Sequence, residues 1–420
     1  MMPRSTMSPL TSPETQLSDA APRPAALSPA TLARAALTYL AEPGDPALGA
    51  LLGICEPAEA VAAIKADMLP GTGPGCGDTP ASRAALARAL ARWRARLPGL
   101  PGDADIAAAC RDGIRLVCPG DPEWPDPLDQ LGPARPYALW LLGDADLRLG
   151  CQRSVSMVGS RAATGYGAHV AGEIAADLAE RGWVVVSGGA YGVDAAAHRG
   201  ALAAEGITIA VLACGVDYPY PAGHAELFAD IATRGLVISE WPPGRRPGRM
   251  RFLIRNRTIA ALTCGTVIVE AGERSGALNT ARHAADLGKP LMAVPGPVTS
   301  AQSAGCHRII REWGASCVTR AADIIELLSP LTVTDAPGPA DGQSLADDRA
   351  AAASDPARDD LDADSAQVLD AFPARGAAGT STIAVEAGVD LDTLLRCLGV
   401  LTAYGFIERC DGGWRLRKPG

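Results

Sequence analysis

The stretch that decides the fold is SVSMVGSRAATGYGAHVAGEIAADLAERGWVVVSGGAYGVDAAAH, residues 154–198. It opens with an apolar run at Val155–Val158 and continues with a segment of helical periodicity at Ala168–Glu180. The same order then repeats, with an apolar run at Val184–Val186 and a second helical segment at Val193–Ala204. Short buried strands that alternate with helices predict a parallel sheet with both faces covered.

The alternation continues as far as Trp313. Further strands are predicted at Thr208–Leu212, Leu236–Ser239, Thr266–Val269 and Leu291–Val294, and further helices at His224–Thr233, Ile254–Leu262, Ala277–Leu287 and Cys306–Trp313. Because crossovers between parallel strands are right-handed, this pattern predicts a Rossmann-like, doubly wound α/β core.

The composition of the flanking segments predicts the other domains. We expect a disordered tail at residues 1–27, a small helical N-terminal domain at 28–110, the core with a Pro-rich connector at 111–330, an acidic flexible linker at 331–365 and a winged-helix domain at 366–420. The connector leads into an apolar strand at Tyr137–Leu142. The last domain is expected to have helices at Ala366–Phe372, Thr382–Ala387 and Leu391–Ala403, then a hairpin of Phe406–Arg409 and Gly413–Leu416.

Charge is unevenly distributed along the 420 residues. The net charge of −9, from 38 basic and 47 acidic residues, argues against a nucleic-acid partner if it is taken as a whole. Counted by segment, however, residues 1–150 carry −4, residues 151–330 carry +2 and residues 331–420 carry −7. Six arginines lie within residues 245–257, and no acidic residue lies between Glu240 and Glu270. For an anion site, this local excess matters more than the total charge.

Several classes of protein are disfavoured by what the sequence lacks. It has no run of 18 apolar residues and its N-terminus resembles no secretory signal, so we expect neither a membrane-spanning helix nor secretion. The eleven cysteines are scattered without a C-x-x-C pair, which is typical of reduced thiols in a cytoplasm and gives no metal-ligand spacing. Neither a G-x-G-x-x-G nor a P-loop motif occurs. We therefore expect a cytoplasmic protein without a metal ion or cofactor.

Glycine-rich turns follow three of the predicted strands. They contain Gly159, Ser160 and Arg161 after the first strand, Gly188 and Gly189 after the second, and Ser275 with Gly276 after the strand at Thr266–Val269. Backbone N–H groups in such turns, followed by a helix N-terminus, favour an anion. A tight turn with a surface arginine is the simpler alternative for the first of them.

Two carboxylates lie beside these turns. Asp194 follows the second turn and Glu270 ends the strand before the third. Together they can serve as a general acid and base. The alternative is structural, with Asp194 capping a helix and both carboxylates holding the loops through backbone or arginine groups.

The arginine-rich segment is the strongest candidate for binding. Its candidate ligand contacts are Arg249, Arg251, Phe252, Arg255, Asn256 and Arg257, a set suited to phosphates and a stacked base. Arg255 and Arg257 cannot share one helix face, because residues two apart point about 200° apart. If the segment is still extended at Arg255, both arginines can enter the groove. We favour a helix, in which one of them turns inward to hold Glu270 or a neighbouring loop and the other meets phosphate together with Arg251.

These motifs resemble the DprA/Smf family of DNA-processing proteins. The matching strings are VGSRAATGYG from Val158, SGGAYGVDAAAH from Ser187, IAVLACGVDYPYP from Ile209, RFLIRNRTIAAL from Arg251, VIVEAGERSGALNTA from Val267 and AVPGPV from Ala293. The resemblance implies a Rossmann-like core that binds single-stranded DNA, loads the RecA recombinase onto it in natural transformation, and forms a homodimer. It also implies that Arg161 and the segment 251–257 contact the DNA.

The competing interpretation is enzymatic. The same Rossmann-like superfamily includes nucleotide-processing phosphoribohydrolases, which carry a P-G-G-x-G-T-x-x-E string that this chain lacks. The two end domains are interpreted as protein contacts rather than DNA readers. The N-terminal turn is acidic, with Glu42 and Asp45, and the third helix of the last domain offers only Arg396.

Overall fold

The computed structural model describes residues 27–68, 80–111, 113–329, 361, 363–373, 377–403, 406–410 and 413–417. The expected tail apart from Leu27, and most of the expected acidic linker, lie outside these residues. Five helices precede the sheet: α1 (Pro29–Leu40), α2 (Pro46–Leu52), α3 (Pro57–Ala66), α4 (Pro80–Ala95) and α5 (Asp103–Ala109). Proline stands in the first turn of α1, α2 and α3, where its missing N–H removes no helix hydrogen bond.

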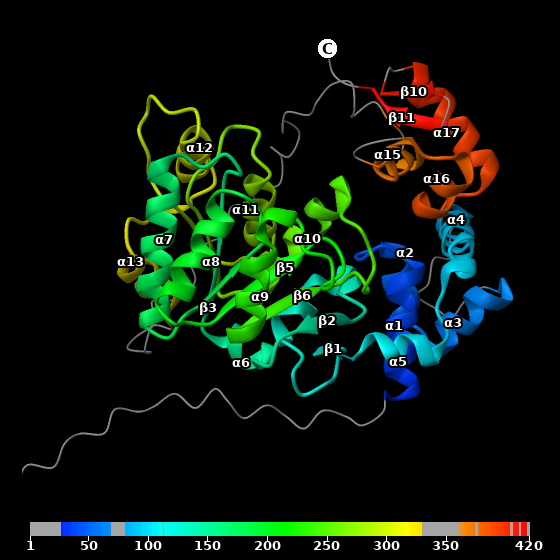
Figure 1. Cartoon of the computed structure of the whole chain (residues 1–420), viewed down its shortest axis with the longest axis horizontal. Coiled ribbons are helices and arrows are strands. Elements are labelled where there is room, and N and C mark those ends of the chain that lie inside the picture. Colours follow the sequence, from blue (N-terminus) through cyan, green and yellow to red (C-terminus); the bar gives the residue numbers. More distant parts are fainter. Residues whose placement is uncertain are drawn as a thin grey trace, which may run out of the picture.

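One nine-stranded sheet forms the centre of the molecule (Figure 1). Its strands are β1 (Ile114–Val117), β2 (Leu139–Leu142), β3 (Ser154–Val158), β4 (Val184–Ser187), β5 (Thr208–Leu212), β6 (Leu236–Ser239), β7 (Gly265–Ile268), β8 (Leu291–Ala293) and β9 (Ser316–Cys317). They lie in the order β1-β2-β6-β5-β4-β3-β7-β8-β9. Strands β3 to β9 are parallel, and the chain reverses its direction of travel across the sheet at β3. The expected large, mostly parallel sheet is confirmed.

The first two strands extend this sheet in a way that the sequence did not predict. The expected strand at Tyr137–Leu142 is β2, and it pairs antiparallel with β6, with Trp140 opposite Ser239. Strand β1 pairs antiparallel with β2. The connector is therefore part of the sheet.

Helices cover both faces of the sheet. They are α6 (Leu147–Gln152), α7 (Gly165–Glu180), α8 (Val193–Ala203), α9 (Ala225–Arg234), α10 (Arg249–Leu262), α11 (Ala277–Asp286), α12 (Ala304–Glu312) and α13 (Ala321–Leu328). Alternate strand residues face opposite layers, as the two-residue period of a strand requires. Ile209 and Val211 pack with α10 to α12, whereas Ala210 and Leu212 pack with α9 and the N-terminal helices.

Helix α10 differs from its predicted extent. It was expected at Ile254–Leu262, and it begins five residues earlier at Arg249. The prediction relied on apolar periodicity, but the first half of this helix buries arginine side chains instead. Arginine and methionine are good helix formers, so nothing in the segment opposes the earlier start.

The C-terminal unit has its own apolar core. Helices α15 (Ala363–Asp370), α16 (Thr380–Ala387) and α17 (Leu391–Ala403) precede a two-stranded antiparallel sheet of β10 (Ile407–Cys410) and β11 (Gly413–Leu416). Its core contains Val368, Ile383, Leu394 and Leu398. In Figure 1 this unit lies next to α4, away from α7 and α13. Within the described ranges, no helix is both long and apolar enough to cross a membrane.

Candidate nucleic-acid interface

The predicted turns meet at one edge of the sheet, because the carboxyl ends of parallel strands share an edge. Backbone hydrogen bonds tie them together: the amide of Ser160 donates to the carbonyl of Glu270 at 2.7 Å, and the amide of Val193 donates to the carbonyl of Ser160 at 3.2 Å. Gly159 is required at this crossing, since a Cβ there would lie 2.6 Å from the Val193 side chain and 2.8 Å from the Glu270 carbonyl.

Arg161 is an exposed cation at this edge. Its guanidinium carbon lies 4.7 Å from the centre of the Phe252 ring, a cation–π distance. The neighbouring Ser160 is buried, and its hydroxyl accepts from the amide of Ala162 at 3.1 Å. The first turn thus presents an arginine to solvent and uses its serine to hold the loop.

Tyr220 packs beside Phe252, and Tyr191 lies in the turn after β4. The Tyr220 ring lies 5.7 Å from the Phe252 ring, and the Tyr191 ring lies 4.5 Å from that of His224. Tyr191 and Tyr220 are 52% and 43% exposed, although large aromatic side chains are usually more buried. Exposed rings beside an arginine provide surfaces on which bases stack.

The sequence analysis did not single out these tyrosines. Tyr218 and Tyr220 belong to the Tyr-Pro-Tyr-Pro string that follows β5, and Tyr191 lies within the turn after β4. Two tyrosines separated by one proline, six and eight residues after a predicted buried strand, were the available signal.

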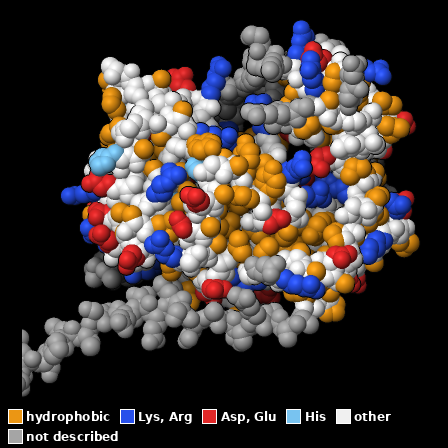
Figure 2. Space-filling model, viewed as in Figure 1, with side chains coloured by type: hydrophobic (Ala, Val, Ile, Leu, Met, Phe, Trp, Pro, Cys, Tyr) orange, Lys and Arg blue, Asp and Glu red, His pale blue; other side chains and the backbone are white. Residues whose placement is uncertain are grey.

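Figure 2 shows hydrophobic side chains gathered over the centre of the viewed face, with Lys and Arg side chains around them.

The second glycine turn is filled by protein groups. A Cβ on Gly188 would lie 2.4 Å from the Arg255 guanidinium, and a Cβ on Gly189 would lie 2.5 Å from the Phe228 ring. Gly189 also has a positive φ of +70°, which favours glycine. Both glycines are buried. The Arg255 guanidinium fills the space beside Gly188, and the Phe228 ring fills the space beside Gly189.

Arg255 is buried and holds the edge together. Its Nη1 donates to the carbonyls of Gly188, at 2.8 Å, and of Val211. Burial lowers the pKa of Arg255 to about 10, and the charge of Asp194 counteracts this effect. Asp194 accepts from the amide of Ala190 at 3.3 Å. Burial raises the pKa of Asp194, while Arg255 favours its charged form. Asp194 does not cap α8 as expected, because it lies in the first turn of that helix and the N-cap residue is Gly192. Its contacts with Ala190 and Arg255 fit the other structural expectation, that this carboxylate holds the loop.

Arg257 has a carboxylate partner, but the predicted partner is wrong. Its Nη1 and Nη2 donate to the two oxygens of Glu240, at 2.6 and 2.7 Å. Glu270 instead accepts from the amide and hydroxyl of Thr164, at 2.9 and 2.7 Å. The sequence analysis chose Glu270 because it ends the next strand along the chain, whereas Glu240 follows β6, on the other side of β3 in the sheet.

Arg251 and Asn256 are also bound within the protein. Arg251 donates from Nε and Nη2 to Glu42, at 3.2 and 2.9 Å. Asn256 donates to the side chain of Asn279 at 3.2 Å and to the carbonyl of Gly276 at 3.4 Å. Together with Arg255 and Arg257, these residues are four expected DNA contacts whose side chains are buried. The expectation that one of Arg255 and Arg257 faces outward together with Arg251 does not fit this burial.

The remaining expected contacts reach the surface. Arg249 and Gly276 are exposed, and Phe252 and Ser275 are half-buried. The Ser275 hydroxyl accepts from the amide of Ala277 at 3.3 Å, at the start of α11. The solvent-facing part of the candidate interface therefore comprises Arg161, Arg249 and Phe252, with Ser275–Gly276 and the tyrosines. In the described part of the chain, no group of three or more His, Cys, Asp or Glu side chains is placed to hold a metal ion.

Comparison with known proteins agrees with the resemblance in sequence. The family described as DNA recombination-mediator protein A matches residues 115–329. The putative DNA processing protein DprA of Mycobacterium tuberculosis is 47% identical over 326 residues, which cover 75% of this chain and 80% of the relative. The DNA processing protein DprA of Bacillus subtilis is 33% identical over 245 residues, covering 58% of this chain and 80% of that protein. The X-ray structure of DprA from Streptococcus pneumoniae matches with a TM-score of 0.55 and 28% identity, covering 72% of this chain and 99% of that chain.

Proposed function

Because this chain belongs to the family of DNA recombination-mediator protein A, we propose that it binds single-stranded DNA at the carboxyl edge of its sheet and delivers the strand to the RecA recombinase. The observation that carries the proposal is the surface group of the exposed Arg161 and Tyr220 with the half-buried Phe252 between them. The names of the relatives, DNA processing proteins, support DNA as the ligand.

The exposed group fits single strands better than duplex. A guanidinium binds a phosphate through a planar pair of donors, and a neighbouring ring stacks on an unpaired base. Bases in a duplex are already stacked on each other and do not offer their faces. Backbone contacts carry no sequence information, so we expect little sequence preference.

The delivery to RecA and a homodimeric state are proposed from the resemblance in sequence. We also propose that the C-terminal unit is a winged helix, since three helices followed by a hairpin is the order of that domain. The only basic residue of its third helix, Arg396, is paired with Asp364 at 3.0 Å. This pairing favours a protein contact over DNA reading for that helix.

The test compares two arginines at opposite ends of one strand. Arg161 follows β3 and stacks on Phe252, whereas Arg153 precedes β3 and lies 5.6 Å from the Trp183 ring. Arg161→Ala should weaken binding to a fluorescent oligothymidylate by about 1–3 kcal/mol, the range for a charge-assisted contact. It should also make the log–log salt slope less negative by about 0.7, one phosphate contact. Arg153→Ala removes the same charge and should do neither.

Two outcomes would contradict the proposal. Equal losses in both variants would mean that net charge, rather than this edge, governs binding. Stronger binding to duplex than to single strands would exclude stacking on Phe252 and Tyr220. Delivery is measured as RecA filament formation on strands coated with single-strand-binding protein, which Arg161→Ala should slow in parallel with its loss of affinity.

A further inference from the structure

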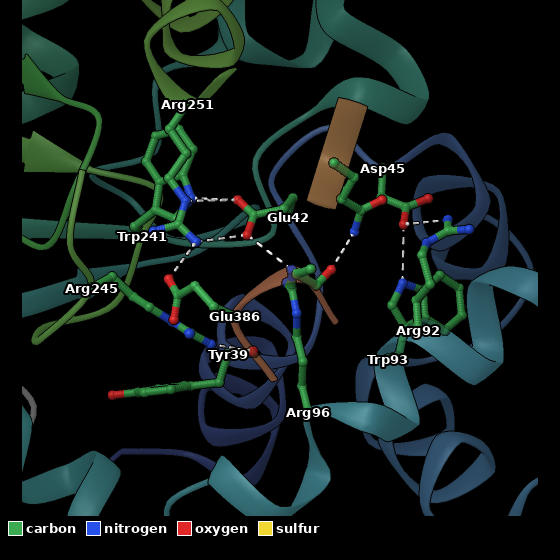
Figure 3. A network of polar contacts seen from close by, with 12 residues as sticks. Tyr39, Glu42, Asp45, Arg92, Trp93, Arg96, Trp241, Arg245, Arg251 and Glu386 are labelled. Atoms are coloured by element: carbon green, nitrogen blue, oxygen red, sulfur yellow. Dashed lines mark hydrogen bonds and ion pairs between the residues drawn. The ribbon is translucent and has the colours of Figure 1, made fainter. Parts of the chain in front are cut away.

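Helix α16 of the C-terminal unit contacts arginines next to the interface. Glu386 on this helix lies 3.7 Å from Nη2 of Arg251 (Figure 3). Just beyond the helix, Gly388 has a φ of +65° and lies against Arg96, so that an added Cβ would be 2.6 Å from Nε of Arg96. Two separate contacts therefore dock this unit onto the rest of the molecule.

The docking site is an arginine cluster with too few carboxylates. Arg96 and Arg251 both donate to Glu42, at 3.1 and 2.9 Å, and Arg245 donates to the carbonyl of Tyr39 at 2.7 Å. Burial lowers the pKa of Arg245, as do the nearby arginines, while the charges of Glu42 and Glu386 oppose this effect. The guanidinium groups of Arg96, Arg245 and Arg251 thus lie near two carboxylates. One carboxylate, Glu42, follows α1, and the other, Glu386, comes from the C-terminal unit.

This cluster lies directly beside the proposed DNA edge. Arg251 precedes Phe252 on α10, and its Nη1 donates to the carbonyl of Arg246 at 2.6 Å. Arg246 and Arg249, on the same segment, are exposed. A strand that binds at Phe252 and Arg249 would bring its phosphates next to the position of Glu386.

The contact made by Glu386 is weak enough to be exchanged. The separation of 3.7 Å exceeds hydrogen-bond length, and the Glu386 side chain is 41% exposed. The hydrogen bonds of the buried Arg251 side chain go to Glu42 and to the Arg246 carbonyl, so Glu386 interacts with it through charge alone. A partly solvated contact of this kind contributes little to stability. A phosphate carries the same charge and offers several acceptor oxygens, so it can replace the carboxylate at Arg251.

We propose that the C-terminal unit is a displaceable cover, with Glu386 occupying the place of a strand phosphate until single-stranded DNA releases it. The proposal rests on the proposed function. Charge is consistent with it, because residues 331–420 carry −7 and residues 151–330 carry +2. Docking of the C-terminal unit then competes with binding of the DNA strand. Only a ligand whose phosphates can displace the Glu386 carboxylate binds at this position.

Glu386→Gln in the full chain tests this, with Glu408→Gln as the matched control. Glu408 is 41% exposed like Glu386, and it pairs with Arg415 inside the same unit, at 2.6 Å. Both variants remove one negative charge from an arginine-paired glutamate. Only Glu386→Gln should bind oligothymidylate more tightly, by about two- to fivefold, the equivalent of an exposed ion pair. Hydrogen exchange at Thr380–Ala387 should be faster in this variant without DNA, and faster in the wild type when the oligonucleotide is added.

The outcomes separate the cover from the proposed function. Equal gains in affinity in both variants, or none in either, would overturn the cover while leaving the wild type a DNA-binding protein. Slower hydrogen exchange at Thr380–Ala387 on adding DNA would also overturn the cover, since the C-terminal unit would then bind the strand rather than be displaced by it. A wild-type chain that binds no oligothymidylate overturns the proposed function and, with it, the cover.

Discussion

His198 on α8 is a buried side chain whose protonation state is set by its neighbours. The hydroxyl of Thr208 donates to the carbonyl of Val185 at 2.6 Å, so it accepts from Nδ1 of His198, 2.7 Å away. The proton is therefore on Nδ1, and Nε2 has no partner among the described residues. Burial lowers the pKa of His198 to about 3, and the charges of His224 and Arg255 add to this effect.

The buried neutral imidazole predicts a loss of stability at mildly acidic pH. The ordinary histidine pKa is 6.5, so the unfolded chain takes up a proton below that pH while the folded chain does not until about 3. Stability is thus fully present above pH 6.5 and is lost as the pH falls toward 3. By pH 5 this should reach about 2 kcal/mol in urea unfolding. His198→Asn should be less stable at pH 7 but lose less between pH 7 and pH 5; the same slope in both would contradict the assignment.

At the scale of the element, α10 shows what a single sequence can and cannot predict about a site. The excess of arginine indicated that this segment has specific partners, and Arg251, Arg255 and Arg257 do bind carboxylate or carbonyl groups. Those partners are far away in the chain: Glu42 is 209 residues from Arg251, and Gly188 is 67 residues from Arg255. The pattern in the chain is the same whether an arginine faces solvent or a distant carboxylate, so burial could not be predicted from it.

Arg257 provides the sharpest test of this correction. Its pair with Glu240 is almost fully buried, with side chains 8% and 2% exposed. Arg257→Ala leaves an unpaired buried carboxylate and should cost about 3–5 kcal/mol in denaturant unfolding. Arg257→Lys should recover only part, because an ammonium cannot form two parallel hydrogen bonds. The exposed Arg249→Ala should change stability by less than about 0.5 kcal/mol.

A further variant separates charge from packing. Adding Glu240→Gln to Arg257→Ala removes the uncompensated carboxylate and should restore part of the lost stability. If Arg257→Ala were as stable as Arg249→Ala, the guanidinium would face solvent and would again be a candidate DNA contact.

At the scale of the whole molecule, the alternation of strands and helices was sufficient to predict β3 to β8 and their parallel pairing. It could not predict that β1 and β2 continue the sheet in the antiparallel direction, because a four-residue apolar strand carries no sign of its neighbour's direction. Nor could it predict that Trp140 on β2 packs in one core with Leu37 of the N-terminal helices. Those helices and the sheet share a continuous apolar core.

Besides the shared apolar core, a charged contact at Glu42 also connects the N-terminal helices to the sheet domain. Its carboxylate accepts from Arg251, from Arg96 at 3.1 Å and from Nε1 of Trp241 at 2.8 Å, and thereby joins the N-terminal helices to α10 (Figure 3). Burial alone would raise the pKa of Glu42, but Arg251 and Arg96 with their hydrogen bonds hold it well below its usual range. Its stabilising effect is present above the unfolded pKa of 4.5 and is lost as the pH falls below that value.

Glu42→Gln should therefore lower stability at neutral pH and remove part of the acid sensitivity below pH 4.5. We expect a loss of about 2 kcal/mol, less than for a fully buried pair because the Glu42 side chain is 26% exposed. Calorimetry should still show one transition, since Leu37 and Trp140 keep the helices and the sheet in a common core. Glu173→Gln, which removes an exposed carboxylate paired with His169, is the control and should leave the melting temperature unchanged. Two separate transitions in Glu42→Gln would mean that the charged link, rather than the apolar core, makes the two parts unfold together.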